Sequence, residues 1–72
     1  MVDTEKLRNK VVSSGLKYKF LAEELGLSRY GLQLKIDGKN DFMTSEVAEL
    51  CKLLNISTLT EKEAIFFSKK VD

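Results

Sequence analysis

Two short amphipathic runs, joined by the tripeptide Gly-Leu-Ser, restrict the fold of this chain more than any other feature of its sequence. Both runs lie between residues 18 and 38, and in each the apolar residues recur at the spacing of one helix face. Gly26 can adopt the left-handed backbone that ends a helix, and Ser28 can cap the helix that follows. The stretch therefore predicts two short helices, over about Tyr18–Leu25 and Arg29–Asp37, joined by a tight turn.

A third helical pattern precedes this pair. It begins at a cap on Asp3 or Thr4 and runs to about Ser14, with Gly15 as its C-terminal stop. The chain contains no proline, so each helix boundary must be set by a glycine or a polar cap.

Two more helices are expected after the pair. Thr44 or Ser45 is expected to cap one that carries the cleanest helical stripe of the chain. The members of the stripe are Val47, Leu50, Cys51 and Leu54. Thr60 and Glu63 have the spacing of a capping box, which predicts a last helix to about Lys69. Since no segment alternates as a strand does, we predict an all-α fold of five helices in one domain, residues 1–72.

Composition narrows the classes of function. The chain has 72 residues, of which 43% are apolar and 32% charged, as in a small soluble globular domain. It has no apolar run long enough to span a membrane and no signal peptide, so we expect a cytoplasmic protein without membrane contact. One cysteine, no histidine and scattered carboxylates leave few groups for catalysis or metal binding. We therefore expect no enzyme, no cofactor and no metal site.

The central pair also carries a family resemblance. Leu-Ala at 21–22, Gly-Leu-Ser at 26–28, Leu32, Ile36 and then Gly38-Lys39 form a pattern that resembles the Cro/repressor-type (XRE-like) helix-turn-helix family of temperate phages and bacterial regulators. The resemblance spans most of the chain. It implies a compact five-helix bundle of the phage repressor type, with the helix-turn-helix at the second and third helices. It also implies a component of a lytic/lysogenic-like genetic switch, in the cytoplasm of a bacterial host cell.

Residue roles follow from the same resemblance. In this family the second helix of the motif usually enters the DNA major groove, and Ser28, Arg29, Tyr30 and Gln33 occupy its base-facing positions. Arg29 could pair with guanine and Gln33 with adenine through bidentate hydrogen bonds. Four lysines are expected to contact phosphates, namely Lys17, Lys19, Lys35 and Lys39.

The outward face of the third helix points to a different partner. At about 100° per residue, with Leu32 and Ile36 turned to the core, Tyr30 and Leu34 lie at the outward centre beside Asp37. Aromatic and apolar anchors are typical of protein interfaces. The net charge of +1 agrees, because strong DNA binders usually carry a marked basic excess.

Two hypotheses about the partner therefore stand side by side. In the first, this helix binds double-stranded operator DNA, with the chain acting as a Cro-like regulator, either alone or as a homodimer. In the second, the apolar face binds the cognate phage repressor, so that the chain is an anti-repressor that modulates the repressor's DNA binding. Gly31, which weakens the helix by about 1 kcal/mol relative to alanine, is expected to admit close approach of either partner.

Overall fold

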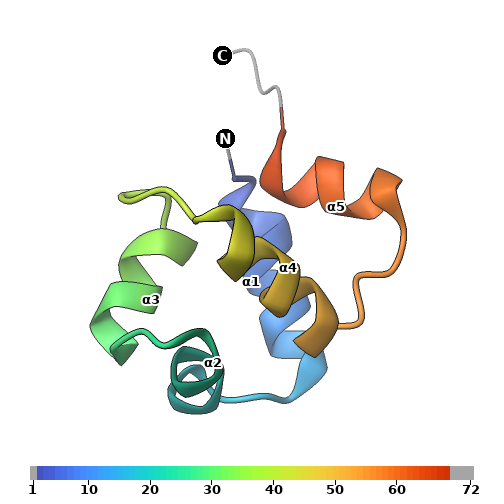
Figure 1. Cartoon of the computed structure of the whole chain (residues 1–72). Coiled ribbons are helices and arrows are strands. Elements are labelled where there is room, and N and C mark those ends of the chain that lie inside the picture. Colours follow the sequence, from blue (N-terminus) through green and yellow to red (C-terminus); the bar gives the residue numbers. More distant parts are fainter. Residues whose placement is uncertain (1, 69–72) are drawn as a thin grey trace.

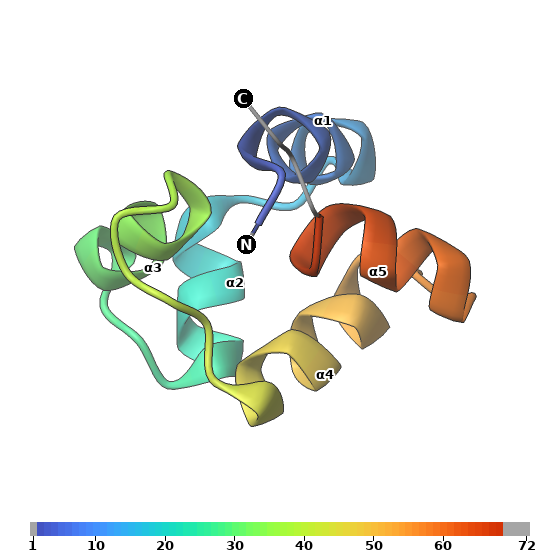
Figure 2. The same ribbon diagram turned by 90° about the horizontal axis from the view of Figure 1, so that it is seen from above.

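The computed structural model describes residues 2–68, and within that range it contains five α-helices and no strand. The helices are α1 (Thr4–Ser14), α2 (Tyr18–Leu25), α3 (Arg29–Ile36), α4 (Thr44–Leu53) and α5 (Leu59–Phe66). α2 packs against α3 and α4, and α1 packs against α3 and α5. In Figure 1 and in the view from above (Figure 2), α3 and α5 lie on opposite sides of the molecule. The predicted all-α fold of five helices is confirmed.

Local chemistry accounts for the starts of α1 and α3 and for the ends of α1 and α2, whereas α2 begins after Lys17, which makes no side-chain capping hydrogen bond. The Asp3 carboxylate accepts a hydrogen bond from a backbone N–H of the first turn of α1, and Gly15 ends that helix at φ 73°. Gly26 ends α2 at φ 70°, and the Ser28 hydroxyl caps α3. These two glycines are needed because a left-handed backbone is strained for other residues. α3 ends at Ile36, one residue before the expected Asp37.

The start of α4 differs from the expectation. Neither Thr44 nor Ser45 caps the helix, because the N-cap residue is Met43, whose side chain makes no capping hydrogen bond. Instead the Glu46 carboxylate reaches back and accepts the backbone N–H of Met43 at 2.8 Å. Glu46 thus supplies the half of a capping box that does not depend on a Ser or Thr at the N-cap.

The start of α5 was also predicted in the wrong place. The hydroxyl of Thr58, not of Thr60, caps this helix by accepting the backbone N–H of Glu61 at 3.2 Å. Both threonines precede a glutamate by three residues, so the two capping patterns overlap and the earlier one is used. α5 ends at Phe66, short of Lys69, which lies outside the described residues.

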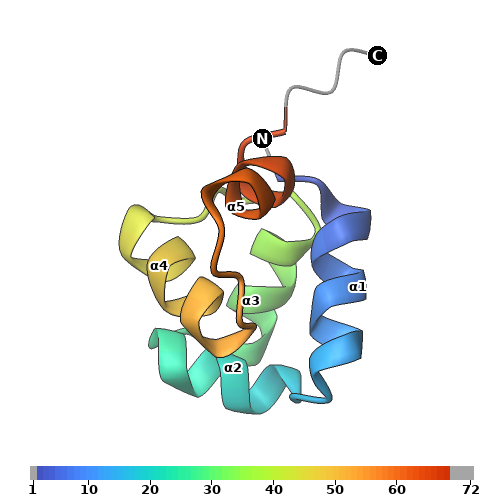
Figure 3. The ribbon, with the colours of Figure 1, turned by 90° about the vertical axis from the view of Figure 1, so that its right-hand side faces the viewer.

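The core combines residues from all five helices, and the largest fully buried side chains come from α1 to α4. These are Leu7, Leu21, Leu32, Ile36 and Leu50. The whole predicted stripe of α4 is buried, which includes Cys51, and burial raises the pKa of its thiol. The start of the chain is fastened to the last helix, since the backbone N–H of Asp3 donates to the carbonyl of Ile65 at 2.6 Å. Figure 3 shows α5 at the top of the bundle, beside the first turn of α1.

No helix within residues 2–68 has the length and apolar character needed to cross a membrane.

Truncation of the α3 anchor tests this core. We expect Leu32→Ala to lower the free energy of unfolding by about 2–5 kcal/mol, because it leaves a cavity beneath α3. Val12→Ala is the control, since Val12 is 79% exposed on α1 and should change stability by less than about 0.5 kcal/mol. Urea unfolding measures both, and equal losses in the two variants would contradict the described packing.

Candidate functional site

Only the amino-terminal half of α3 projects from the molecule. Ser28 and Arg29 are exposed, and the Tyr30 side chain is 71% exposed. Leu34, one turn further on, is half-buried. At the end of α3 the backbone N–H of Lys39 donates to the carbonyl of Leu34 at 2.9 Å, in the turn that leads into the next loop. The outward centre is therefore Tyr30, rather than the Tyr30–Leu34 pair expected from the helical wheel.

Gln33 is held by a carboxylate of its own helix end. Its amide nitrogen donates to both carboxylate oxygens of Asp37, at 3.1 and 3.0 Å. The Arg8 guanidinium of α1 donates to the same carboxylate at 2.5 Å. Bidentate recognition of adenine needs both the amide donor and the amide acceptor of a glutamine. In this arrangement the amide group of Gln33 is oriented by Asp37, so paired hydrogen bonds to adenine would require Gln33 to share or leave this contact.

Asp37 is correspondingly not an isolated acid on the outward face. The hydrogen bonds from Arg8 and then Gln33 hold the pKa of its carboxyl below the usual range. The contact with Asp37 likewise raises the pKa of the Arg8 guanidinium. The negative charge of Asp37, which was expected to face a partner, is thus balanced by the Arg8 guanidinium of α1.

Lys35 is placed in an intramolecular ion pair. Its ammonium lies 2.5 Å from a carboxylate oxygen of Glu46, and the two side chains are only 14% and 8% exposed. Burial by itself raises the pKa of Glu46, but the hydrogen bonds from Lys35 and from the backbone N–H of Met43 outweigh it and leave that pKa below the usual range. A phosphate contact by Lys35, as predicted, would require this pair to break.

Three of the other predicted cations gather on one surface. Lys17, Lys19 and Arg29 line a shallow groove of about 460 Å³ between the end of α1 and the start of α2, together with the exposed Val12. Lys39 is exposed in the loop after α3 and does not line this groove. The predicted positive residues are therefore split between a basic groove, a buried pair and a separate loop.

No protein-family model, curated protein or solved structure matches this chain. The functional interpretation consequently depends on its own residues and on the family resemblance in its sequence.

Two contributors to this site carried no functional signal in the sequence. Arg8 lies 29 residues before its partner Asp37, so no local pattern connects them. Glu46 could have been recognised only through its spacing from Met43. A Cβ atom at Gly31 would lie 3.1 Å from the capping hydroxyl of Ser28, a close contact that a small shift of the serine would relieve.

The Asp37 network predicts a particular dependence of stability on pH. Because the folded-state pKa of Asp37 is lowered, its stabilising effect is present above the unfolded-state pKa of about 3.9 and is lost as the pH falls through the folded value. We expect the difference in unfolding free energy between wild type and Asp37→Asn to be constant near neutral pH and to shrink below about pH 4. Urea unfolding across this range measures it, and a difference that does not change in acid would contradict the network.

The buried pair can be tested by removing one partner or neutralising both. Lys35→Met leaves the Glu46 carboxylate buried without its cation and should lower the free energy of unfolding by about 3 kcal/mol. The double variant Lys35→Met/Glu46→Gln keeps an oxygen for the cap of α4 and buries no charge, so it should be the more stable of the two. Urea unfolding at neutral pH compares them, and the reverse order would refute the assignment.

Proposed function

We propose that this protein is a transcriptional regulator of the helix-turn-helix type that acts by binding another protein. The partner is a repressor of the phage type, the binding surface is the exposed half of α3, and the consequence is altered DNA binding by the repressor. The observation that supports this proposal best is the internal engagement of Gln33, Lys35 and Asp37. It leaves Arg29 and Tyr30 as the exposed large side chains of α3, and Tyr30 is the aromatic one of the two.

The chemistry of the exposed surface favours a protein partner. Tyrosine combines a large apolar ring with a polar tip and is enriched among the residues that dominate protein interfaces. Half-buried Leu34 lies one turn from Tyr30 on the same side of α3 and extends the apolar contact. The apolar surface of Leu34 and of the Tyr30 ring would gain little in a groove of DNA, since only thymine offers an apolar methyl group in the major groove, although the Tyr30 hydroxyl could donate to a phosphate.

A gel-shift experiment tests the proposal directly. The probe is the operator DNA of a candidate repressor, incubated with the repressor, with this protein and with both. We expect this protein to abolish the repressor's shift and to produce none of its own. A repressor shift that persists at saturating concentrations of this protein would refute the proposal.

Substitutions on α3 locate the contact. Tyr30→Ala should weaken repressor binding about 30-fold, as expected for a hot-spot residue worth about 2 kcal/mol, and Leu34→Ala should weaken it by less. Leu59→Ala is the matched control, because Leu59 is 68% exposed at the start of α5, on the other side of the molecule. Calorimetry or fluorescence anisotropy gives the three affinities. Equal affinities for wild type and Tyr30→Ala would exclude this surface.

Direct operator binding is the second candidate function. It is favoured by the basic groove, in which Lys17, Lys19 and Arg29 lie beside the first turn of α3. A Cro-like homodimer would place two such surfaces about 34 Å apart on one face of the duplex. This candidate predicts a shift by the protein alone that weakens steeply with salt and is lost in Arg29→Ala. Absence of that shift at low salt would eliminate it.

A further inference from the structure

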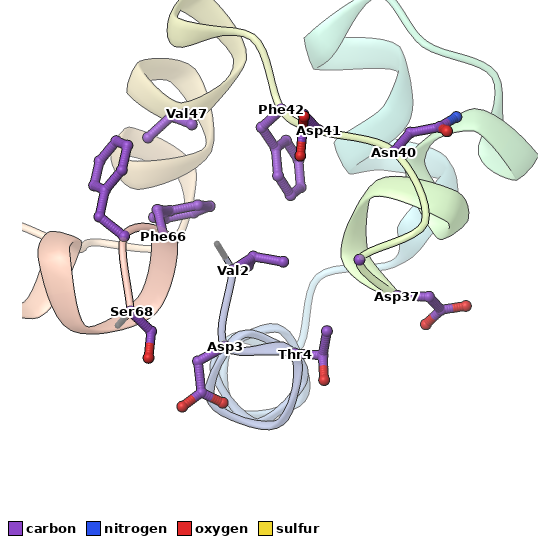
Figure 4. Close-up of a pocket in the computed structure, with 12 residues that line it drawn as sticks. Val2, Asp3, Thr4, Asp37, Asn40, Asp41, Phe42, Val47, Phe66 and Ser68 are labelled. Carbon is purple, nitrogen blue, oxygen red and sulfur yellow. The ribbon is translucent and has the colours of Figure 1, made fainter. Parts of the chain in front are cut away.

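A second concave surface lies away from the exposed half of α3. It has a volume of about 650 Å³ and is bounded by the first residues of α1, the loop between α3 and α4, and the end of α5. That volume is within the range of small-ligand sites, and it can accept one large side chain with its neighbours. Figure 4 shows Val2, Phe42 and Phe66 converging on its middle from these three segments.

The floor of this groove is apolar and rigid. The rings of Phe42 and Phe66 meet edge to face with their centroids 5.6 Å apart, and Val47 is buried behind them. Gly38 brings the loop close to the start of the chain, since a Cβ atom there would lie 3.3 Å from a methyl carbon of Thr4. The groove is therefore formed by fixed contacts between segments that are distant in sequence.

One wall of the groove carries an uncovered aromatic side chain. Phe67 lines the groove and is 55% exposed, although its neighbour Phe66 is buried. An exposed phenyl ring beside an apolar floor is a surface that gains free energy when another apolar group covers it.

The charged side chains that line this groove are all acidic. The charged residues that line the groove are Asp3, Asp37 and Asp41, and no lysine or arginine of the described chain is among them. Asp3 caps α1 and Asp37 is paired with Arg8, and in Figure 4 both carboxylates point away from the floor. Asp41 is exposed at the mouth beside Phe42 and makes no ion pair within residues 2–68. Arg8 already pairs with Asp37, whereas Asp41 is left able to pair with a positively charged group that approaches the groove.

We propose that this groove docks a segment of a partner protein in which an aromatic or branched apolar side chain stands next to a lysine or arginine. The apolar side chain covers Phe67 and the Phe42–Phe66 floor, and the cation pairs with Asp41. The proposal is independent of the function proposed for α3, because Tyr30 does not line this groove.

Two blocked dipeptides that share a ring and differ in charge test the proposal. N-acetyl-Lys-Phe-amide and N-acetyl-Glu-Phe-amide are titrated into the isotope-labelled protein and followed by two-dimensional NMR. We expect the lysine peptide to bind with a millimolar Kd and to shift the amide signals of Phe42, Val47 and Phe66. The glutamate peptide should bind more weakly.

Variants separate the charged contact from the apolar one. Asp41→Asn should weaken the lysine peptide about two- to fivefold, the range of one exposed ion pair, and should leave the glutamate peptide no weaker. Phe67→Ala should weaken both peptides. Glu23→Gln on α2 and Leu59→Ala at the far end of α5 are the controls, and both should bind as wild type does.

Three results would overturn the proposal. They are no localised shift by the lysine peptide, equal binding of the two dipeptides, and unchanged binding in both Asp41→Asn and Phe67→Ala. Signals of the groove that move with protein concentration in the absence of peptide would identify a second copy of the chain as the occupant, and would also refute it.

Discussion

The ion pair between Lys35 and Glu46 links the two halves of this small fold. Lys35 stands near the end of α3, and Glu46 caps the start of α4 through the backbone N–H of Met43. One carboxylate oxygen of Glu46 therefore fixes where α4 begins and joins that point to the end of α3. The pair is nearly excluded from water, so the loss of one partner would leave a buried charge that the fold cannot solvate. Such a pair contributes more to a defined arrangement of helices than to net stability.

α3 is held at the same end by a second polar network. Arg8 of α1 binds Asp37, and Asp37 in turn receives the amide of Gln33. With α4 fastened through Lys35 and α1 through Asp37, the carboxyl-terminal half of α3 is fixed to the bundle. The amino-terminal half, which carries Arg29 and Tyr30, is left to project. The exposed surface of α3 is therefore its amino-terminal half, because contacts with α1 and α4 hold its carboxyl-terminal half.

Local sequence chemistry predicted where the helices lie better than it predicted the contacts that the helices make with one another. Gly26 and Ser28 act within a few residues of their own positions, so the turn between α2 and α3 could be derived from the sequence. The apolar stripe of α4 was predictable for the same reason. The start of α5 was not, because Thr58 and Thr60 each precede a glutamate by three residues and local spacing does not distinguish them.

The candidate site was predicted less completely because its polar contacts join distant segments. Arg8 and Asp37 are 29 residues apart, and Lys35 and Glu46 are 11 apart on different helices. A helical wheel treats α3 as an isolated cylinder, and it therefore placed Leu34 at the outward centre. The half-burial of Leu34 and the contact of α1 with Asp37 depend on the packing of the whole fold, which no single-helix pattern contains.

The net charge of +1 conceals an uneven distribution of charge, which bears on the choice of partner. Lys17, Lys19 and Arg29 lie at the end of α1 from which α2 departs, whereas Asp41 and the apolar groove lie near the start of α1. Near-neutrality of the whole chain is therefore weak evidence against binding to DNA, since a local basic surface suffices for phosphate contact. The stronger argument is positional. The basic groove flanks α3, while the projecting half of α3 presents Tyr30 beside Arg29. A helix inserted in a groove of DNA must read bases with the side chains that project, so base reading by this helix would depend mainly on Ser28 and Arg29, since Gln33 and Lys35 are engaged within the protein.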